Sequence, residues 1–147
     1  MPVYSIRRLC WAGPAATLSA ILLDVLYYGV TKALGEQYLI PVTANGSQLN
    51  PLPAATIVVT ILVAGLVATV FFGLLISFAR KPATVFLSVA ITALIVSFGG
   101  PFSLPAASIH TKLLLSGMHG IAALIITAGI PLFSRNKNII PNKKSNV

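Results

Sequence analysis

Residues 54–79 read AATIVVTILVAGLVATVFFGLLISFA, an apolar run that holds no charged side chain. A transmembrane helix needs about 20 predominantly apolar residues to cross roughly 30 Å of hydrocarbon. The stretch therefore predicts a membrane-spanning helix, and it decides the class of the chain. Gly65, Thr69 and Gly73 recur at every fourth position along it, and such a row of small side chains lets a second helix approach closely.

Three more apolar segments have the same character and lie at about 11–34, 83–98 and 112–133. The chain has 147 residues, of which 8% are charged and 56% hydrophobic, and its mean hydropathy is +0.93. A soluble domain has about 25% charged residues, so this chain is not one. Four spans joined by short connections predict an all-α polytopic membrane protein, a four-helix up-down transmembrane bundle over residues 1–134. We expect residues 135–147 to form a basic, disordered cytoplasmic tail.

The positive charge is distributed unevenly along the chain. There are ten Lys and Arg residues against two Asp and Glu, a formal net charge of +8. Eight of the ten basic residues cluster at 7–8, 80–81 and 135–144, whereas Lys32 and Lys112 lie at the opposite ends of the predicted helices. Because cytoplasmic loops carry an excess of Lys and Arg, we predict that both termini face the cytoplasm and that the protein spans the cytoplasmic membrane.

The same distribution bears on the expected partners. Short clusters at helix ends are unlike the continuous basic surface that is typical of nucleic-acid binding. The predicted partner is therefore the lipid bilayer and not nucleic acid. The sequence also has no catalytic, nucleotide-binding or metal-binding motif, and its single cysteine is Cys10. We expect neither an enzyme nor a bound cofactor or metal ion.

Two polar residues stand out inside the predicted spans, Asp24 in the first and His119 in the fourth. At a rise of 1.5 Å per residue, both lie about 10 Å from the outer boundary of the membrane. If the first and fourth helices are neighbours, the two side chains can share a hydrogen bond. One interpretation is a polar clamp that fixes which helices pair. A second is a functional polar pocket or proton relay, because ionisable residues within a membrane are costly and commonly functional. A third is that the two side chains do not touch.

The predicted contact faces follow the small residues. On the second helix they are Gly65, Thr69 and Gly73, and on the fourth they include Ser116 and Gly120. Small residues are enriched wherever membrane helices pack. Such faces can meet inside one bundle or between two copies, so a homo-oligomer or a membrane protein partner is also expected.

Four stretches of the chain resemble a family of small four-helix bacterial membrane proteins of unknown function. They are LDVLYY at 23–28, ALG at 33–35, SFGGP at 97–101 and MHGIAA at 118–123. The resemblance extends over about residues 8–135 and implies an integral membrane protein with the predicted bundle.

The resemblance also bears on individual positions. It implies that the third helix ends at a Gly-Pro break at Pro101 and that the fourth begins around a Met-His pair, here Met118 and His119. Relatives often have Asn where this chain has Asp24, and an amide can clamp two helices but cannot carry a proton.

These observations favour a non-enzymatic integral membrane protein, an accessory or interaction bundle of otherwise unknown activity. The alternative is a small proton-coupled transporter or permease that uses the candidate pair Asp24 and His119.

Overall fold

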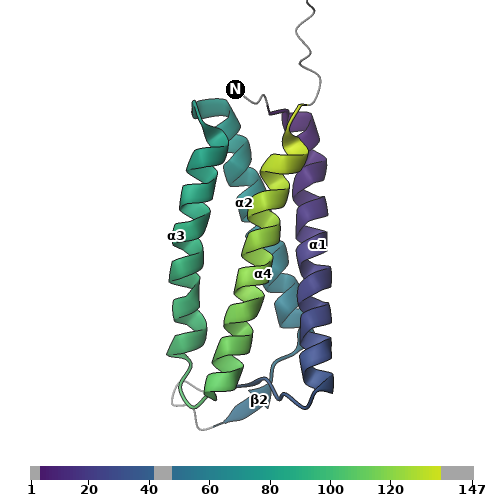
Figure 1. Cartoon of the computed structure of the whole chain (residues 1–147), viewed down its shortest axis with the longest axis vertical. Helices are drawn as coiled ribbons and strands as arrows, with labels where there is room; N and C mark the ends of the chain where they lie inside the picture. Colours follow the sequence, from purple (N-terminus) through teal and green to yellow (C-terminus); the bar gives the residue numbers. More distant parts are fainter. Residues whose placement is uncertain (1–3, 42–47, 137–147) are drawn as a thin grey trace, which may run out of the picture.

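The computed structural model describes residues 4–41 and 48–136. The described residues form four long helices and one small hairpin (Figure 1). Each of the four helices is long and apolar enough to cross a membrane, in agreement with the four predicted spans. The elements are α1 (Ile6–Ala33), β1 (Leu39–Pro41), β2 (Leu49–Pro51), α2 (Ala54–Phe78), α3 (Pro82–Ser103) and α4 (Ile109–Ser134).

The helices run alternately up and down, and the first and last of them lie side by side (Figure 1). α1 packs on α4 and α2, while α3 packs on α4 and α2. At one end of the bundle the backbone N–H of Ser5 donates to the carbonyl of Ser134 over 3.1 Å. The first and fourth helices are therefore neighbours, which is the condition under which Asp24 and His119 could meet. Both ends of the described chain lie at one end of the bundle.

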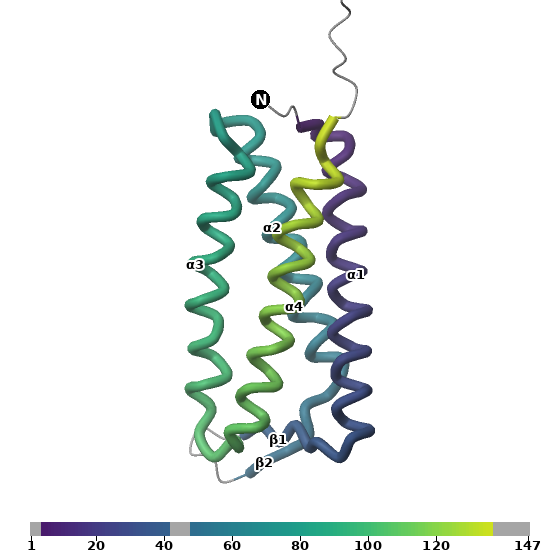
Figure 2. Tube along the Cα trace, viewed as in Figure 1, coloured from purple at the N-terminus to yellow at the C-terminus, as the bar shows by residue number. Residues whose placement is uncertain are grey.

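The opposite end of the bundle is covered by the hairpin (Figure 2). Strands β1 and β2 pair antiparallel, with Leu39 opposite Pro51 and Pro41 opposite Leu49. The sequence predicts only an irregular connection here, so this small sheet is an addition to the predicted all-α fold. We call the two ends of the bundle the terminal end and the hairpin end. Most of the predicted tail, residues 137–147, lies outside the described residues.

Helix α3 extends beyond its predicted end at Phe98 and continues through Gly99-Gly100-Pro101 to Ser103. Proline removes one helical hydrogen bond, and its ring normally clashes with the Cβ of the preceding residue. Because Gly100 has no Cβ, most of that clash is absent. The predicted break at Pro101 is therefore replaced by one more helical turn. α1 is longer too, since it begins at Ile6 and not at residue 11.

Helices α1 and α2 interlock through two glycine–threonine pairs. A Cβ added to Gly65 would lie 2.8 Å from the Cβ of Thr17, and one added to Gly13 would lie 2.9 Å from the Cβ of Thr69. Each threonine hydroxyl donates to the glycine carbonyl four residues earlier in its own helix, over 2.8 Å for Thr17 and 2.7 Å for Thr69. Both hydroxyls are thus satisfied within their own helices, and the whole threonine side chain, hydroxyl and methyl group alike, occupies the space beside the facing glycine. The face with Gly65, Thr69 and Gly73 accordingly packs within one chain.

Helix α3 is fastened mainly at its two ends. Near the terminal end, Phe86 is buried against Phe72 and Phe71, with ring centroids 5.0 Å and 6.2 Å apart. At the hairpin end Pro101 is buried, and these two are the buried residues of α3. The middle of the helix therefore has few side chains that insert between its neighbours.

We predict that Gly65→Ala lowers the free energy of unfolding by about 1–3 kcal/mol, because the new methyl group overlaps the Thr17 side chain. Thermal unfolding in detergent micelles measures this. Gly120→Ala is the matched control, since no described atom lies within 4 Å of its added Cβ. The control should be neutral or stabilising by up to about 1 kcal/mol, as alanine is the better helix former. Equal effects of the two substitutions would contradict the interlock.

Candidate functional site

A cavity of about 390 Å³ lies between α2, α3 and α4, beside the weakly packed middle of α3. This volume is within the range of sites that hold small molecules. Its wall is mostly apolar and draws on all four helices and the residue after β2. The lining residues are Asp24, Leu52, Thr56, Ile57, Thr60, Ile61, Ala64, Ala90, Ala93, Leu94, Ser97, Leu115, Met118, His119, Ala122, Ala123, Ile126 and Thr127.

Asp24 is the contribution of α1 to this wall. Its side chain is only 1% exposed, although α1 is separated from the cavity by its neighbours along most of its length. The Oδ1 atom of this carboxyl group is buried and has no hydrogen-bond partner among the residues that the structure describes. Buried polar atoms are almost always paired in native proteins, and the exceptions call for an explanation. The carboxyl group is therefore the feature of the cavity that an apolar packing role does not account for.

His119 lies on the wall of the same cavity, on α4. Its Nδ1 lies 2.8 Å from the carbonyl of Leu115, one turn earlier. A carbonyl can only accept, so Nδ1 carries the proton, and in the neutral ring Nε2 is left as an acceptor. In the described part of the chain, no hydrogen bond or ion pair joins His119 to Asp24. The structure thus brings the two predicted residues to one cavity but does not pair them directly.

Hydroxyl groups supply the remaining polar atoms of the wall. Thr60 donates its hydroxyl proton to the carbonyl of Thr56, and Ser97 donates its own to the carbonyl of Leu94, both over 2.8 Å. Each oxygen then keeps lone pairs that can only accept from a ligand. Within residues 4–41 and 48–136, no three His, Cys, Asp or Glu side chains lie close enough to hold a metal ion. The arrangement suits an apolar molecule with a polar group.

The hairpin end of the cavity is closed by Leu52, which is buried and follows β2. The Tyr28 hydroxyl donates to the Leu52 carbonyl over 2.7 Å. The Tyr28 ring packs in turn on the buried ring of Tyr38, with centroids 4.8 Å apart. α1 therefore holds the connection that covers the cavity. The sequence alone contains no signal for the contact between Tyr28 and Leu52.

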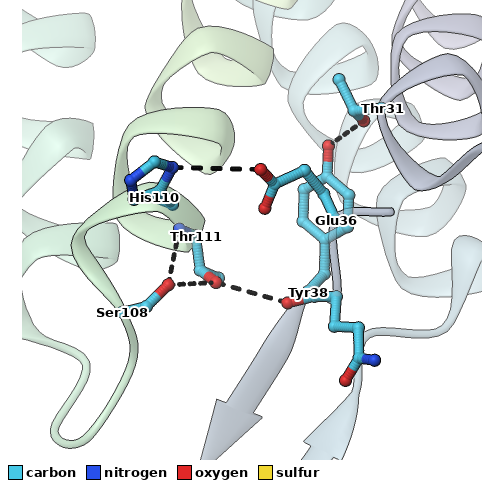
Figure 3. A network of polar contacts seen from close by, with 7 residues as sticks. Thr31, Glu36, Tyr38, Ser108, His110 and Thr111 are labelled. Atoms are coloured by element: carbon cyan, nitrogen blue, oxygen red, sulfur yellow. Dashed lines mark hydrogen bonds and ion pairs between the residues drawn. The ribbon is translucent and has the colours of Figure 1, made fainter. Parts of the chain in front are cut away.

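A polar network fastens this connection to α1 and α4 (Figure 3). The Tyr38 hydroxyl pairs with the Thr31 hydroxyl, and the Thr111 hydroxyl donates to the carbonyl of Gln37 over 3.5 Å. Burial raises the pKa of the Tyr38 phenol above its usual value. His110 Nδ1 lies 3.9 Å from Glu36 Oε1, but both side chains are substantially exposed and the pair adds little stability.

Ser116 and Gly120, which the sequence predicts to pack against a neighbouring helix, make no close helix contact that the structure describes. The Ser116 hydroxyl donates to the carbonyl of Lys112 over 2.8 Å, and Gly120 faces open space among the described residues. The close approach of α4 to α1 occurs at Gly129, where an added Cβ would lie 2.9 Å from the Cβ of Ala16. At Gly117 it would lie 3.0 Å from the Tyr27 hydroxyl. Two glycines outside the predicted row therefore make this contact.

Comparison with protein families agrees with the described architecture. The model of a family of unknown function, DUF6069, matches residues 4–136. The chain belongs to DUF6069. The match covers nearly the whole chain and confirms the resemblance to a family of unknown function that the sequence shows. No match was found among curated proteins or among solved structures. Membership in the family names no activity, so function must be argued from the cavity.

We predict that the effects of Asp24→Asn and His119→Gln on the free energy of unfolding add within about 0.5 kcal/mol, because no hydrogen bond joins the two side chains. Unfolding of the two single variants and the double variant in detergent micelles measures the coupling. Thr31→Val with Tyr38→Phe provides the positive control, since these hydroxyls are paired. That pair should couple by about 0.5–3 kcal/mol. A comparable coupling between Asp24 and His119 would support a clamp instead.

Proposed function

We propose that this chain is a non-enzymatic protein of the cytoplasmic membrane, with both termini in the cytoplasm, that binds a lipid-soluble small molecule between α2, α3 and α4. The observation that carries the proposal is the cavity of about 390 Å³ with an unpartnered buried carboxyl oxygen on its wall. A mostly apolar pocket with a few convergent polar groups is the usual form of a small-molecule site.

The chemistry of the wall supports binding over catalysis. Hydrolysis and group transfer generally require a nucleophile, a base and a group that stabilises developing charge, all in mutual contact. Here one carboxyl group and one imidazole line the cavity without a hydrogen bond between them. Lipid-soluble molecules are also available to a cavity that lies within the membrane-spanning part of a bundle.

The alternative is a proton-coupled transporter that uses Asp24 and His119. Both residues line one cavity, as such a mechanism requires. A transporter also needs a route to each side of the membrane, and transporters commonly build it at the interface of two repeats. The cavity here lies within one four-helix unit and is covered by Leu52 at the hairpin end. Binding is therefore the function that we propose, and transport would be a further property of the same cavity.

Binding can be tested with 4-phenylbutanol as a neutral probe, by calorimetric titration of the full-length protein in phosphatidylcholine nanodiscs. Empty nanodiscs correct for partition of the probe into lipid. We expect saturable binding that Ala123→Phe weakens about tenfold or more, equivalent to about 1.4 kcal/mol, because the ring occupies the cavity. Ala128→Phe is the matched control on α4, since Ala128 is exposed and does not line the cavity. Signals equal to those of empty nanodiscs would contradict the proposal.

The orientation can be tested by labelling with a membrane-impermeant maleimide in intact cells and in lysed cells. Asn50→Cys and Asn136→Cys place exposed thiols at the hairpin end and the terminal end, in a chain whose Cys10 is replaced by Ser. The excess of basic residues at the terminal end predicts labelling of the Asn50→Cys variant in intact cells. The Asn136→Cys variant should react only after lysis. The reverse pattern would place the termini outside.

A further inference from the structure

The polar atoms of the cavity wall are mainly acceptors, and this asymmetry indicates what they bind. Thr60 and Ser97 have already donated their hydroxyl protons to carbonyl groups of their own helices. His119 has donated its Nδ1 proton to the carbonyl of Leu115. Thr56 and Thr127 carry the remaining hydroxyls of the wall, and a hydroxyl can rotate to accept as well as to donate. A ligand with donor groups can therefore pair with more of these atoms than a ligand with acceptors alone.

Asp24 adds a carboxyl oxygen to which no donor in the described chain forms a hydrogen bond. Its Oδ1 is buried without a partner, and the residue is 1% exposed. An ionised carboxylate has no proton to donate and accepts from N–H or O–H groups. Buried charges in proteins are generally paired with an opposite charge. The described basic side chains do not meet this need, because the nearest in sequence, Lys32, lies over the Tyr28 ring at 5.6 Å.

The apolar part of the wall indicates what kind of molecule carries the donor group of the ligand. Apolar side chains from α2, α3 and α4 form most of the surface, among them Ile61, Leu94 and Met118. A hydrated inorganic cation would leave these side chains without contact, whereas a hydrocarbon group would cover them. The ligand should therefore join an apolar body to a compact, positively charged donor.

We propose that the cavity binds lipid-soluble primary amines, whose ammonium group pairs with the Asp24 carboxylate while the hydrocarbon body occupies the space between α2, α3 and α4. The inference rests on the proposed binding function and specifies its ligand class. A primary ammonium group has three N–H donors. One reaches Asp24, and the others can serve the acceptors of His119 and the wall hydroxyls.

The test compares 4-phenylbutylamine with 4-phenylbutanol, which have the same body but differ in the polar group. Both are titrated into the full-length protein in phosphatidylcholine nanodiscs, with empty nanodiscs as the blank. A charge-assisted hydrogen bond to a carboxylate is stronger than a neutral one, so we expect the wild-type protein to bind the amine about tenfold more tightly. Asp24→Asn keeps the shape of the side chain and removes its charge. In that variant the two probes should bind with similar affinity.

The outcomes separate this inference from the function on which it rests. If the alcohol binds and the amine binds no better, a ligand site exists but Asp24 does not select ammonium, and the inference is overturned. If Asp24→Asn keeps the preference for the amine, another group is responsible and the inference fails equally. If neither probe binds, the proposed function itself fails. Asp24→Ala gives a second variant without the carboxylate, and thermal unfolding of each variant verifies that the bundle is intact.

Discussion

The rest of the bundle depends on the interlock between α1 and α2. Helices in lipid gain little from hydrophobic burial against each other, so van der Waals contact at close range must hold them. Gly13 and Gly65 provide the close approach, and Thr69 and Thr17 of the facing helices fill the space. Because both threonine hydroxyls bond within their own helices, the contact has no unsatisfied polar atom. α1 then serves as the support for α4, which approaches it at Gly129.

The opposite side of the bundle is built differently. α3 has no glycine that approaches a neighbour among the described residues, and its two buried residues, Phe86 and Pro101, lie toward its ends. Between them, small side chains such as Ala90 and Ala93 face α2 and α4 across the cavity. An interior this poorly filled forfeits dispersion contacts. Small residues give close contact only where a side chain of the neighbouring helix fills the space beside them. That condition is met between α1 and α2, and it is not met beside the middle of α3, where the cavity lies.

This rule also explains what the sequence reveals and what it does not. Length and hydropathy suffice to predict four spans, and the spacing of Gly65 and Thr69 predicts a contact face on α2. The spacing does not say which helix fills the space beside each glycine, since Gly120 on α4 belongs to a similar row of small residues yet makes no close approach. The Gly99-Gly100-Pro101 sequence likewise predicts a break, because the pattern alone does not show that glycine relieves the clash with proline.

The candidate site was accessible to sequence reasoning only in part. Asp24 can be identified because it is an acidic residue inside an apolar span. Counting residues from the ends of the spans places it at about the same depth as His119. The cavity that both residues line depends on how far apart α2, α3 and α4 lie. No local sequence pattern encodes that distance. The closure by Leu52 is also tertiary, since it requires a hydroxyl on α1 to reach a carbonyl 24 residues later in the chain.

The position of Asp24 on α1 has a mechanical consequence. The carboxyl group lies seven residues beyond Thr17, about two helical turns from the interlock, and the Tyr28 contact lies one turn further on. The segment of α1 that carries Asp24 is therefore held by contacts on both sides. The facing wall belongs to α3, which is exposed along most of its middle and fastened near its ends. The helix that carries the Asp24 acceptor is therefore packed on both sides of it, whereas the apolar wall across the cavity belongs to a helix with few buried side chains.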